Sequence, residues 1–275
     1  MKKIKVGLLL TVTFVLLGCV TPAKQTELLL SRPGSLPVYK EISKVEFIDQ
    51  SVGYCGPATL TMAMRWAGED VSVNEIAAQV YTPGMKGSLQ ADLISASRRH
   101  GLMAVPIHNL SALLTEVAAG HPVIIFENLG LTWAPTWHYA VVLGFDLNHQ
   151  EIILHSGHQA FYHWNLKKFE RSWMLGDYWG LVVLPAGELS VTADELANVT
   201  AAVGLEQAQK FKEAEKSYLK ILDKWPTSLV SLIGLANLKY KNGLRNEAVT
   251  LLRRAIKFHP DSLAAKQNLA VAETK

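Results

Sequence analysis

Two cysteines are present among the 275 residues, and Cys55 lies where a reactive thiol would be expected. It stands between Gly53 and Gly56 and is followed by Pro57, which suits the first turn of a helix because the missing N–H has no partner there anyway. A thiol in that turn meets unpaired backbone N–H groups and the positive end of the helix dipole, which favour the nucleophilic thiolate. Cys55 is therefore a candidate nucleophile, and a buried, inert cysteine is the alternative.

A cysteine nucleophile needs a base, and His138 is the candidate. It opens an apolar run, residues 137–144, that predicts a strand 83 residues after Cys55. A histidine at the edge of such a strand, taken alone, would be read as structural. Together with a cysteine that opens a helix, it predicts a thiol–imidazole pair that forms an acyl-enzyme thioester.

The surrounding segments predict an α+β domain over residues 38–190. Helices are expected over 55–67, near 73–80, over 88–100 and from 111, followed by strands over 122–126, 139–145, 152–154 and 178–184. The β-branched and aromatic runs between turn residues indicate strands of one sheet. Helices followed by strands favour an α+β fold over a doubly wound sheet.

These blocks resemble a known family. A glutamine shortly before Cys55-Gly-Pro-Ala, a helix, and then His138-Tyr-x-Val-Val-x-Gly-Phe-Asp are similar to the papain-like peptidases that process bacteriocin leaders at a double glycine, over most of residues 45–185. The resemblance implies Cys55 as nucleophile and His138 as general base and then acid. It also implies that Gln50 and the Cys55 backbone N–H bind the oxyanion, and one such donor changes the rate by about 10²–10³.

Two positions depart from the family pattern. Gln50 stands five residues before the cysteine, one fewer than in papain, so a polar surface residue is the alternative. The family expects an aspartate where this chain has Ser156, or His155 if the register slips by one. Ser156 would accept a hydrogen bond from the imidazole Nδ1–H as a neutral partner, giving a less stabilised imidazolium than a carboxylate would. Asp146, at the far end of the predicted histidine strand, is read as a turn residue.

The sequence predicts no metal site and no cofactor. His155 and His158 are three residues apart, but around Gly157 in a turn and without the helix of an HExxH motif, so the histidines other than the catalytic candidate are expected on the surface. No phosphate loop or dinucleotide fingerprint occurs. Trp133 and Trp137 are expected to line a substrate groove.

The N-terminus has the pattern of a lipoprotein signal peptide. A basic start is followed by 12 uncharged residues, 6–17, which are too few for a membrane-spanning helix of about 20 residues. Leu16-Leu17-Gly18-Cys19 resembles a lipobox, in which cleavage precedes lipidation of the cysteine; an ordinary secretory signal is the alternative. Residues 1–18 are assigned to the signal peptide and 19–37 to a tether. Val20, not an aspartate, follows the cysteine; in a Gram-negative cell, the resemblance to sorted lipoproteins then implies an outer-membrane location facing the periplasm.

Removal of the signal peptide changes the net charge of the chain, and lipidation of Cys19 leaves Cys55 without a disulfide partner. Without residues 1–18 the chain has 24 basic and 24 acidic residues, which gives no indication of nucleic-acid binding. Cys55 is then the second cysteine beside a lipidated Cys19, and has no disulfide partner in an oxidising compartment.

Residues 193–275 contain an internal repeat. Pro226 and Pro260 are 34 residues apart, and the same offset joins Ala202 to Ala236. The period resembles that of the tetratricopeptide repeat, with about two repeats and a capping helix; a plain helical hairpin is the alternative. Stacked helix pairs form concave surfaces, so a protein or peptide partner is expected, and so few repeats suggest packing on the first domain.

Together these features predict a lipid-anchored cysteine peptidase of the bacterial envelope that acts on a periplasmic peptide or protein. Its fold class would be an α+β papain-like domain followed by an all-α repeat module. Two alternatives remain open. The chain could be a peptidase fold retained as a binding scaffold, because the third catalytic position is not acidic, or an acyl transferase that uses the same thioester chemistry.

Overall fold

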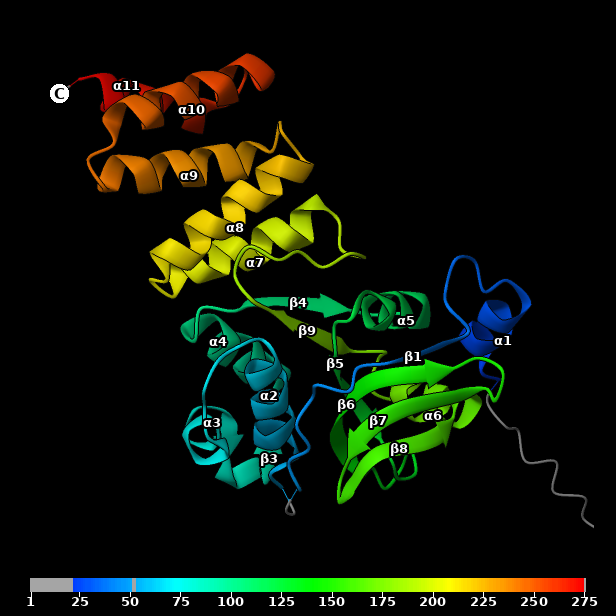
Figure 1. Ribbon diagram of the computed structural model, residues 1–275. Helices are drawn as coiled ribbons and strands as arrows, with labels where there is room; N and C mark the ends of the chain where they lie inside the picture. The colour runs from blue at the N-terminus through cyan, green and yellow to red at the C-terminus, as the bar shows by residue number, and fades with distance from the viewer. Residues whose placement is uncertain (1–21, 51–52, 275) are drawn as a thin grey trace, which may run out of the picture.

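The computed structural model describes residues 22–50 and 53–274 and shows a mixed domain followed by five helices (Figure 1). The expected signal peptide and the candidate lipidation site Cys19 lie outside the described residues. Within the described part of the chain, no helix is long and apolar enough to cross a membrane.

A seven-stranded antiparallel sheet forms the centre of the first domain. The strand order is β4-β9-β5-β6-β7-β8, and the short β1 pairs with the far end of β6. The strands are β1 (Tyr39–Glu41), β4 (Met103–Ile107), β5 (Val123–Asn128), β6 (Trp137–Asp146), β7 (Glu151–Ser156), β8 (Gln159–Asn165) and β9 (Gly180–Leu184). All four predicted strands, now β5, β6, β7 and β9, belong to this one sheet.

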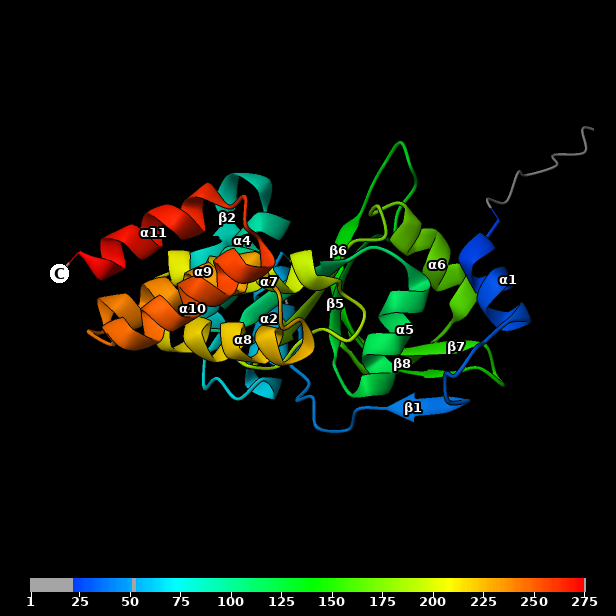
Figure 2. The same ribbon diagram turned by 90° about the horizontal axis from the view of Figure 1, so that it is seen from above.

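Helices lie on both sides of the strands, as two perpendicular views agree (Figures 1 and 2). One group contains α2 (Cys55–Trp66), α3 (Val73–Val80) and α4 (Gln90–Arg99), and the other contains α1 (Lys24–Ser31), α5 (Leu110–Ala119) and α6 (Leu166–Met174). A hairpin of β2 (Tyr81–Thr82) and β3 (Gly87–Ser88), closed by the 3-10 turn η1 (Pro83–Met85), joins α3 to α4. Helix α2 begins at the cysteine, as predicted, and is buried along most of its length.

The expected tether over residues 19–37 is wrong for the part that the structure describes. Residues 24–31 form α1, which packs on α5 and α6. The backbone N–H groups of Gln25 and Thr26 donate to the two carboxylate oxygens of buried Glu170, at 2.9 and 2.6 Å. Leu29 of the same helix is buried. A carboxylate far away in the sequence therefore satisfies the start of this helix and fixes it to the domain.

The C-terminal helices recur with a fixed period. They are α7 (Glu195–Gln207), α8 (Phe211–Lys224), α9 (Leu229–Lys241), α10 (Arg245–Phe258) and α11 (Leu263–Glu273). The starts of α7, α9 and α11 are 34 residues apart, and so are those of α8 and α10. Pro226 and Pro260 follow the ends of α8 and α10, where a residue without an N–H cannot continue the helix. The 34-residue period of the sequence is thus also the spacing at which the helices recur.

The helical module packs on the first domain. Helix α7 contacts β4 and α4, and its Val199, Ala202 and Leu205 belong to the same apolar core as the sheet. A Cβ at Gly204 would lie 2.3 Å from the Arg98 side chain, so a larger residue there would require the guanidinium to move. Packing against the first domain gives α7 an apolar surface that a short repeat array could not supply by itself.

Candidate active site

Cys55 is the first residue of α2 and is partly buried. Its neighbour Gly56 has no room for a side chain, because a Cβ there would lie 2.5 Å from the Ser88 hydroxyl oxygen. The hairpin that carries Ser88 therefore packs against the start of the helix. Burial raises the pKa of the Cys55 thiol, and the backbone N–H groups of Tyr139, Gly56 and Cys55 offset only part of that effect. The N–H groups at the helix start favour the thiolate, as expected, but desolvation is the larger effect, so the pKa of Cys55 is raised overall.

His138 is the second residue of β6 and is oriented by Ser156 at the end of β7. The imidazole Nε2 lies 3.0 Å from the Ser156 hydroxyl oxygen. The expected contact through Nδ1 is therefore wrong; Nε2 makes it, and Nδ1 is the nitrogen left for a proton from a thiol. Burial lowers the pKa of His138 to about 4, so the ring is neutral at physiological pH.

His155, the alternative to Ser156, is a structural residue. Its side chain has no exposure, so the expectation of a surface position is wrong for this histidine. Its Nδ1 accepts from the Phe161 backbone N–H at 3.1 Å, which leaves Nε2–H to donate to the Val45 carbonyl at 3.1 Å. Both ring nitrogens are therefore occupied, and the hydrogen bond to His138 is made by Ser156, not by His155.

Gln50 lies just before α2 and its side chain is 4 % exposed. Its backbone N–H donates to the Gly157 carbonyl at 3.1 Å, which fixes the residue beside the loop after β7. Neither its Oε1 nor its Nε2 has a hydrogen-bond partner among the described residues. Burying an amide that has no partner among the described residues is costly, so the Gln50 amide is a candidate to bind a group that enters the cavity.

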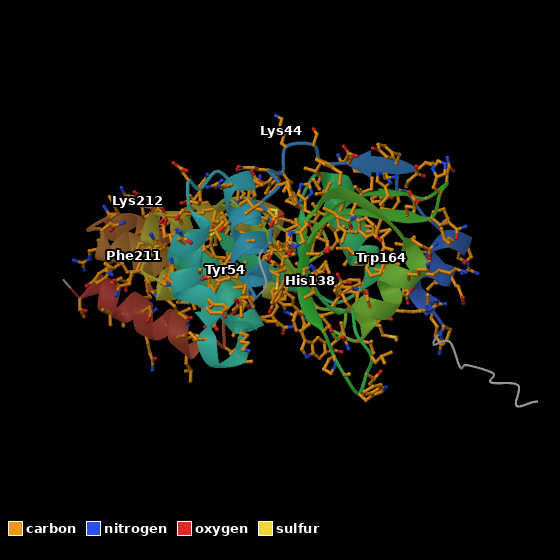
Figure 3. All side chains as sticks on the ribbon, turned by 90° about the horizontal axis from the view of Figure 1, so that it is seen from below. Lys44, Tyr54, His138, Trp164, Phe211 and Lys212 are labelled. Atoms are coloured by element: carbon orange, nitrogen blue, oxygen red, sulfur yellow. The ribbon has the colours of Figure 1, made fainter. Side chains whose placement is uncertain are left out.

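Cys55, His138 and Gln50 line one cavity of about 710 Å³. Its other walls come from the β2–β3 hairpin and from aromatic residues of the sheet, including Trp137 and Tyr139. Figure 3 shows His138 between the α2–α4 helices and the strands. Of the two tryptophans expected beside the groove, Trp137 lines the cavity, whereas Trp133 is 83 % exposed in the loop before β6.

Residues 42–178 match the profile of the Peptidase_C39 like family. The matched segment contains all four candidate residues, Gln50, Cys55, His138 and Ser156, and all the strands of the main sheet except β1 and β9. This C39-like domain is therefore similar to that family, and its α+β content agrees with the predicted fold class. The match supports a cysteine peptidase.

Solved structures show similarity to the same domain, at low identity. One is described as a C39-like peptidase from Bacillus anthracis (18 % identity, 55 % of this chain and 98 % of that one, TM-score 0.45). Another is the peptidase domain of Streptococcus ComA, a bifunctional ABC transporter of a quorum-sensing pathway (17 %, 51 % and 98 %, TM-score 0.43). A third is a double-glycine motif protease of an AMS/PCAT transporter with its leader peptide (21 %, 55 % and 98 %, TM-score 0.41). No curated protein matched this sequence.

The resting C39-like site is a neutral thiol beside a neutral imidazole. No hydrogen bond between described residues joins the Cys55 sulfur directly to His138. Catalytic contacts often tighten only when substrate is bound. The arrangement allows proton transfer from thiol to imidazole as the sulfur attacks, rather than a preformed ion pair.

Asp146 lies at the end of β6 far from His138 and is not part of the cavity. Its carboxylate accepts from the backbone N–H of His149 at 3.0 Å, as a turn residue would. Among the described residues, no group of three or more histidine, cysteine, aspartate or glutamate side chains could hold a metal ion. Glu127, whose side chain is fully buried in the sheet, was not singled out from the sequence. A charged residue directly after the apolar run 122–126 was the signal that could have identified it.

Proposed function

We propose that the chain is a lipid-anchored cysteine peptidase of the cell envelope that hydrolyses peptide bonds of a periplasmic peptide or protein. One observation carries the peptidase part. A helix-opening cysteine, a histidine oriented by a hydroxyl, and a buried amide with no partner among the described residues all line one cavity in a C39-like domain. The three groups correspond to a nucleophile, a base and an oxyanion donor.

Acylation would begin with the thiol. The Cys55 sulfur attacks the carbonyl carbon of the scissile peptide while its proton passes to His138 Nδ1. The carbonyl oxygen becomes an oxyanion that accepts from the Gln50 Nε2–H and the Cys55 backbone N–H. The imidazolium then gives its proton to the leaving amine, the C–N bond breaks, and a thioester remains on Cys55.

Deacylation would use the same groups with water as the nucleophile. His138 takes a proton from a water molecule that attacks the thioester carbonyl, and the oxyanion again accepts from Gln50. Collapse of this intermediate breaks the C–S bond, releases the carboxylic acid, and returns the proton to the sulfur. The neutral partner Ser156 keeps the ring in orientation through both steps.

Anchoring and partner binding belong to the same proposal. Cleavage before Cys19 and lipidation of its thiol would attach the protein to the outer membrane, because two or three acyl chains hold a protein where one binds only weakly. The 34-residue period of α7–α11 supports tetratricopeptide repeats as a surface for the substrate or a protein partner. In a Cys19→Ser variant, we expect the protein in the soluble cell fraction with its peptidase activity retained.

The test of the peptidase is cleavage of a random peptide library by the full chain in detergent micelles, read by mass spectrometry. We expect defined cleavage products from the unmodified protein and none from Cys55→Ser. His138→Gln should lower the rate by at least about 10², as expected for loss of a general base. The matched control is His158→Gln, an exposed histidine outside the cavity, which should cleave normally.

A binding scaffold is the second candidate, and a specific observation favours it. The group that orients His138 is neutral, and burial keeps both Cys55 and His138 uncharged. Binding of library peptides without any cleavage, unchanged in Cys55→Ser, would establish the scaffold and refute the peptidase.

A further inference from the structure

Glu127 is a fully buried carboxyl group near the site. It lies in β5 with no exposed surface. Its Oε2 accepts from the Ser172 hydroxyl of α6 at 2.6 Å, whereas its Oε1 has no hydrogen-bond partner among the described residues. Burying an acidic side chain with one oxygen unsatisfied is costly, and Ser172 alone does not explain why the chain has a glutamate here.

The pairing of the strands places Glu127 beside the candidate base. Glu127 is directly opposite His138 in the antiparallel β5–β6 ladder. Directly opposite residues project from the same face of a sheet, with Cβ atoms about 4.5–5.5 Å apart. Strand β6 lies between β5 and β7, so His138 has Glu127 on one neighbouring strand and its partner Ser156 on the other.

We propose that Glu127 is a positioning residue that supplies the negative charge missing at Ser156. This inference rests on the proposed peptidase function. When His138 takes the thiol proton, a cation forms in a buried site where it would otherwise be unstable. A carboxylate on the residue directly opposite His138 would stabilise that cation, and thereby the thiolate formed with it. An ionised Glu127 neither gains nor loses a proton while the proton passes from Cys55 to His138; its charge alone stabilises the imidazolium.

The ionisation of Glu127 should then control the reactivity of the thiol near neutral pH. Burial raises the pKa of Glu127 to about 7, and the hydrogen bond from Ser172 offsets part of this rise. The groups that face it are His138 from β6 and Ser172 from α6. In the loop after α6, Asp177 is exposed, and the Tyr178 hydroxyl donates to Glu170 at 3.2 Å. The carboxyl group is therefore neutral in mild acid and charged above neutrality.

The test is the rate of Cys55 alkylation by iodoacetamide from pH 5.5 to 8.5, in the full chain in detergent. Mass spectrometry of the peptide that carries Cys55 separates it from Cys19. We expect Glu127→Gln to react like the unmodified protein at pH 5.5 and roughly tenfold more slowly at pH 8. A neighbouring opposite charge shifts a pKa by about one to three units, and a shift of one unit changes the thiolate fraction, and with it the alkylation rate, about tenfold. In the double variant with His138→Gln, the Glu127 substitution should have no further effect.

The control is Glu170→Gln, which changes another buried glutamate of the same domain that contacts α1 instead of the site. Its pH profile should be that of the unmodified protein. If His138→Gln leaves alkylation unchanged, the proposed peptidase function fails. If His138→Gln slows alkylation but Glu127→Gln has no effect, or an equal effect at every pH, only the role of Glu127 is refuted.

A second measurement does not depend on folding of a variant. In the unmodified protein, the NMR signal of the His138 ring carbon should shift near pH 7, although the ring itself stays neutral there, because the neighbouring carboxyl group ionises. A signal that is constant between pH 6 and 8 would overturn the proposal.

Discussion

Replacing Gln50 by leucine should make the protein more stable and nearly inactive. The Gln50 side chain is buried, and neither end of its amide has a partner among the described residues. Leucine has a similar volume and no polar atoms, so the substitution removes an unsatisfied amide without leaving a large cavity. The backbone hydrogen bond from Gln50 to Gly157 does not involve the side chain and should persist.

The magnitude of both effects follows from the site. A buried polar group without a partner costs about 1–3 kcal/mol, so Gln50→Leu should raise the free energy of unfolding by roughly 1–2 kcal/mol after loss of some packing. For a protein of this size that is a rise in melting temperature of about 2–6 °C. Loss of one oxyanion donor should lower kcat by about 10²–10³.

Two assays on the same preparation separate these effects. Thermal unfolding followed by circular dichroism gives the stability, and cleavage of a peptide selected from the library gives kcat. Gln50→Glu is the matched control, because it keeps the length but replaces the donor by a carboxylate, and should lose both activity and stability. A Gln50→Leu protein that cleaves at more than about a third of the normal rate, or that melts at a lower temperature, would refute the reasoning.

Three further predictions follow from named contacts. Ser156→Ala removes one neutral hydrogen bond to His138, worth about 0.5–1.5 kcal/mol, so kcat/KM should fall about 2- to 10-fold; a fall beyond 100-fold would mean that Ser156 does more than orient the ring. His138 has a native pKa of about 4 and an unfolded value of about 6.5, so between these values only the unfolded chain binds the proton and stability falls as pH falls. Urea unfolding at pH 5 and 7 should therefore show a smaller loss of stability in acid for His138→Gln than for the unmodified protein. Glu170→Gln removes the charged acceptor at the start of α1, and hydrogen exchange at Gln25 and Thr26 should become faster while β6 stays protected.

The placement of Cys55 and His138 at one cavity and the main strands could be predicted because their signals are local. Pro57 and the flanking glycines mark the start of a helix at Cys55, and the run from His138 to Phe145 is long, apolar and β-branched. Both elements formed as predicted because the local preference agrees with the burial that the sheet provides.

The features that were missed depend on distant partners or weak patterns. Helix α1 is short and is fixed by Glu170, about 145 residues away, so nothing in residues 19–37 could indicate it. Strand β4 contains Pro106, which argues against a strand except at a sheet edge, where β4 lies. Strand β8 is an edge strand with mostly exposed residues and gave no clear alternation. By contrast, Leu166, Phe169 and Trp173 have helical spacing and could have predicted α6.

The roles of Gln50 and Glu127 follow from the neutral state of the resting site. Because burial raises the pKa of Cys55 and lowers that of His138, separating charge between them is unfavourable until substrate arrives. The energy of the transition state then depends on groups that meet the new charges: a donor for the oxyanion and an anion for the imidazolium. Gln50 lines the cavity with a donor that no described residue accepts, and Glu127 is a buried acid on the strand next to that of His138. A site with a permanent thiolate–imidazolium pair would have less need of Glu127, so the pH dependence of Glu127→Gln distinguishes the two mechanisms.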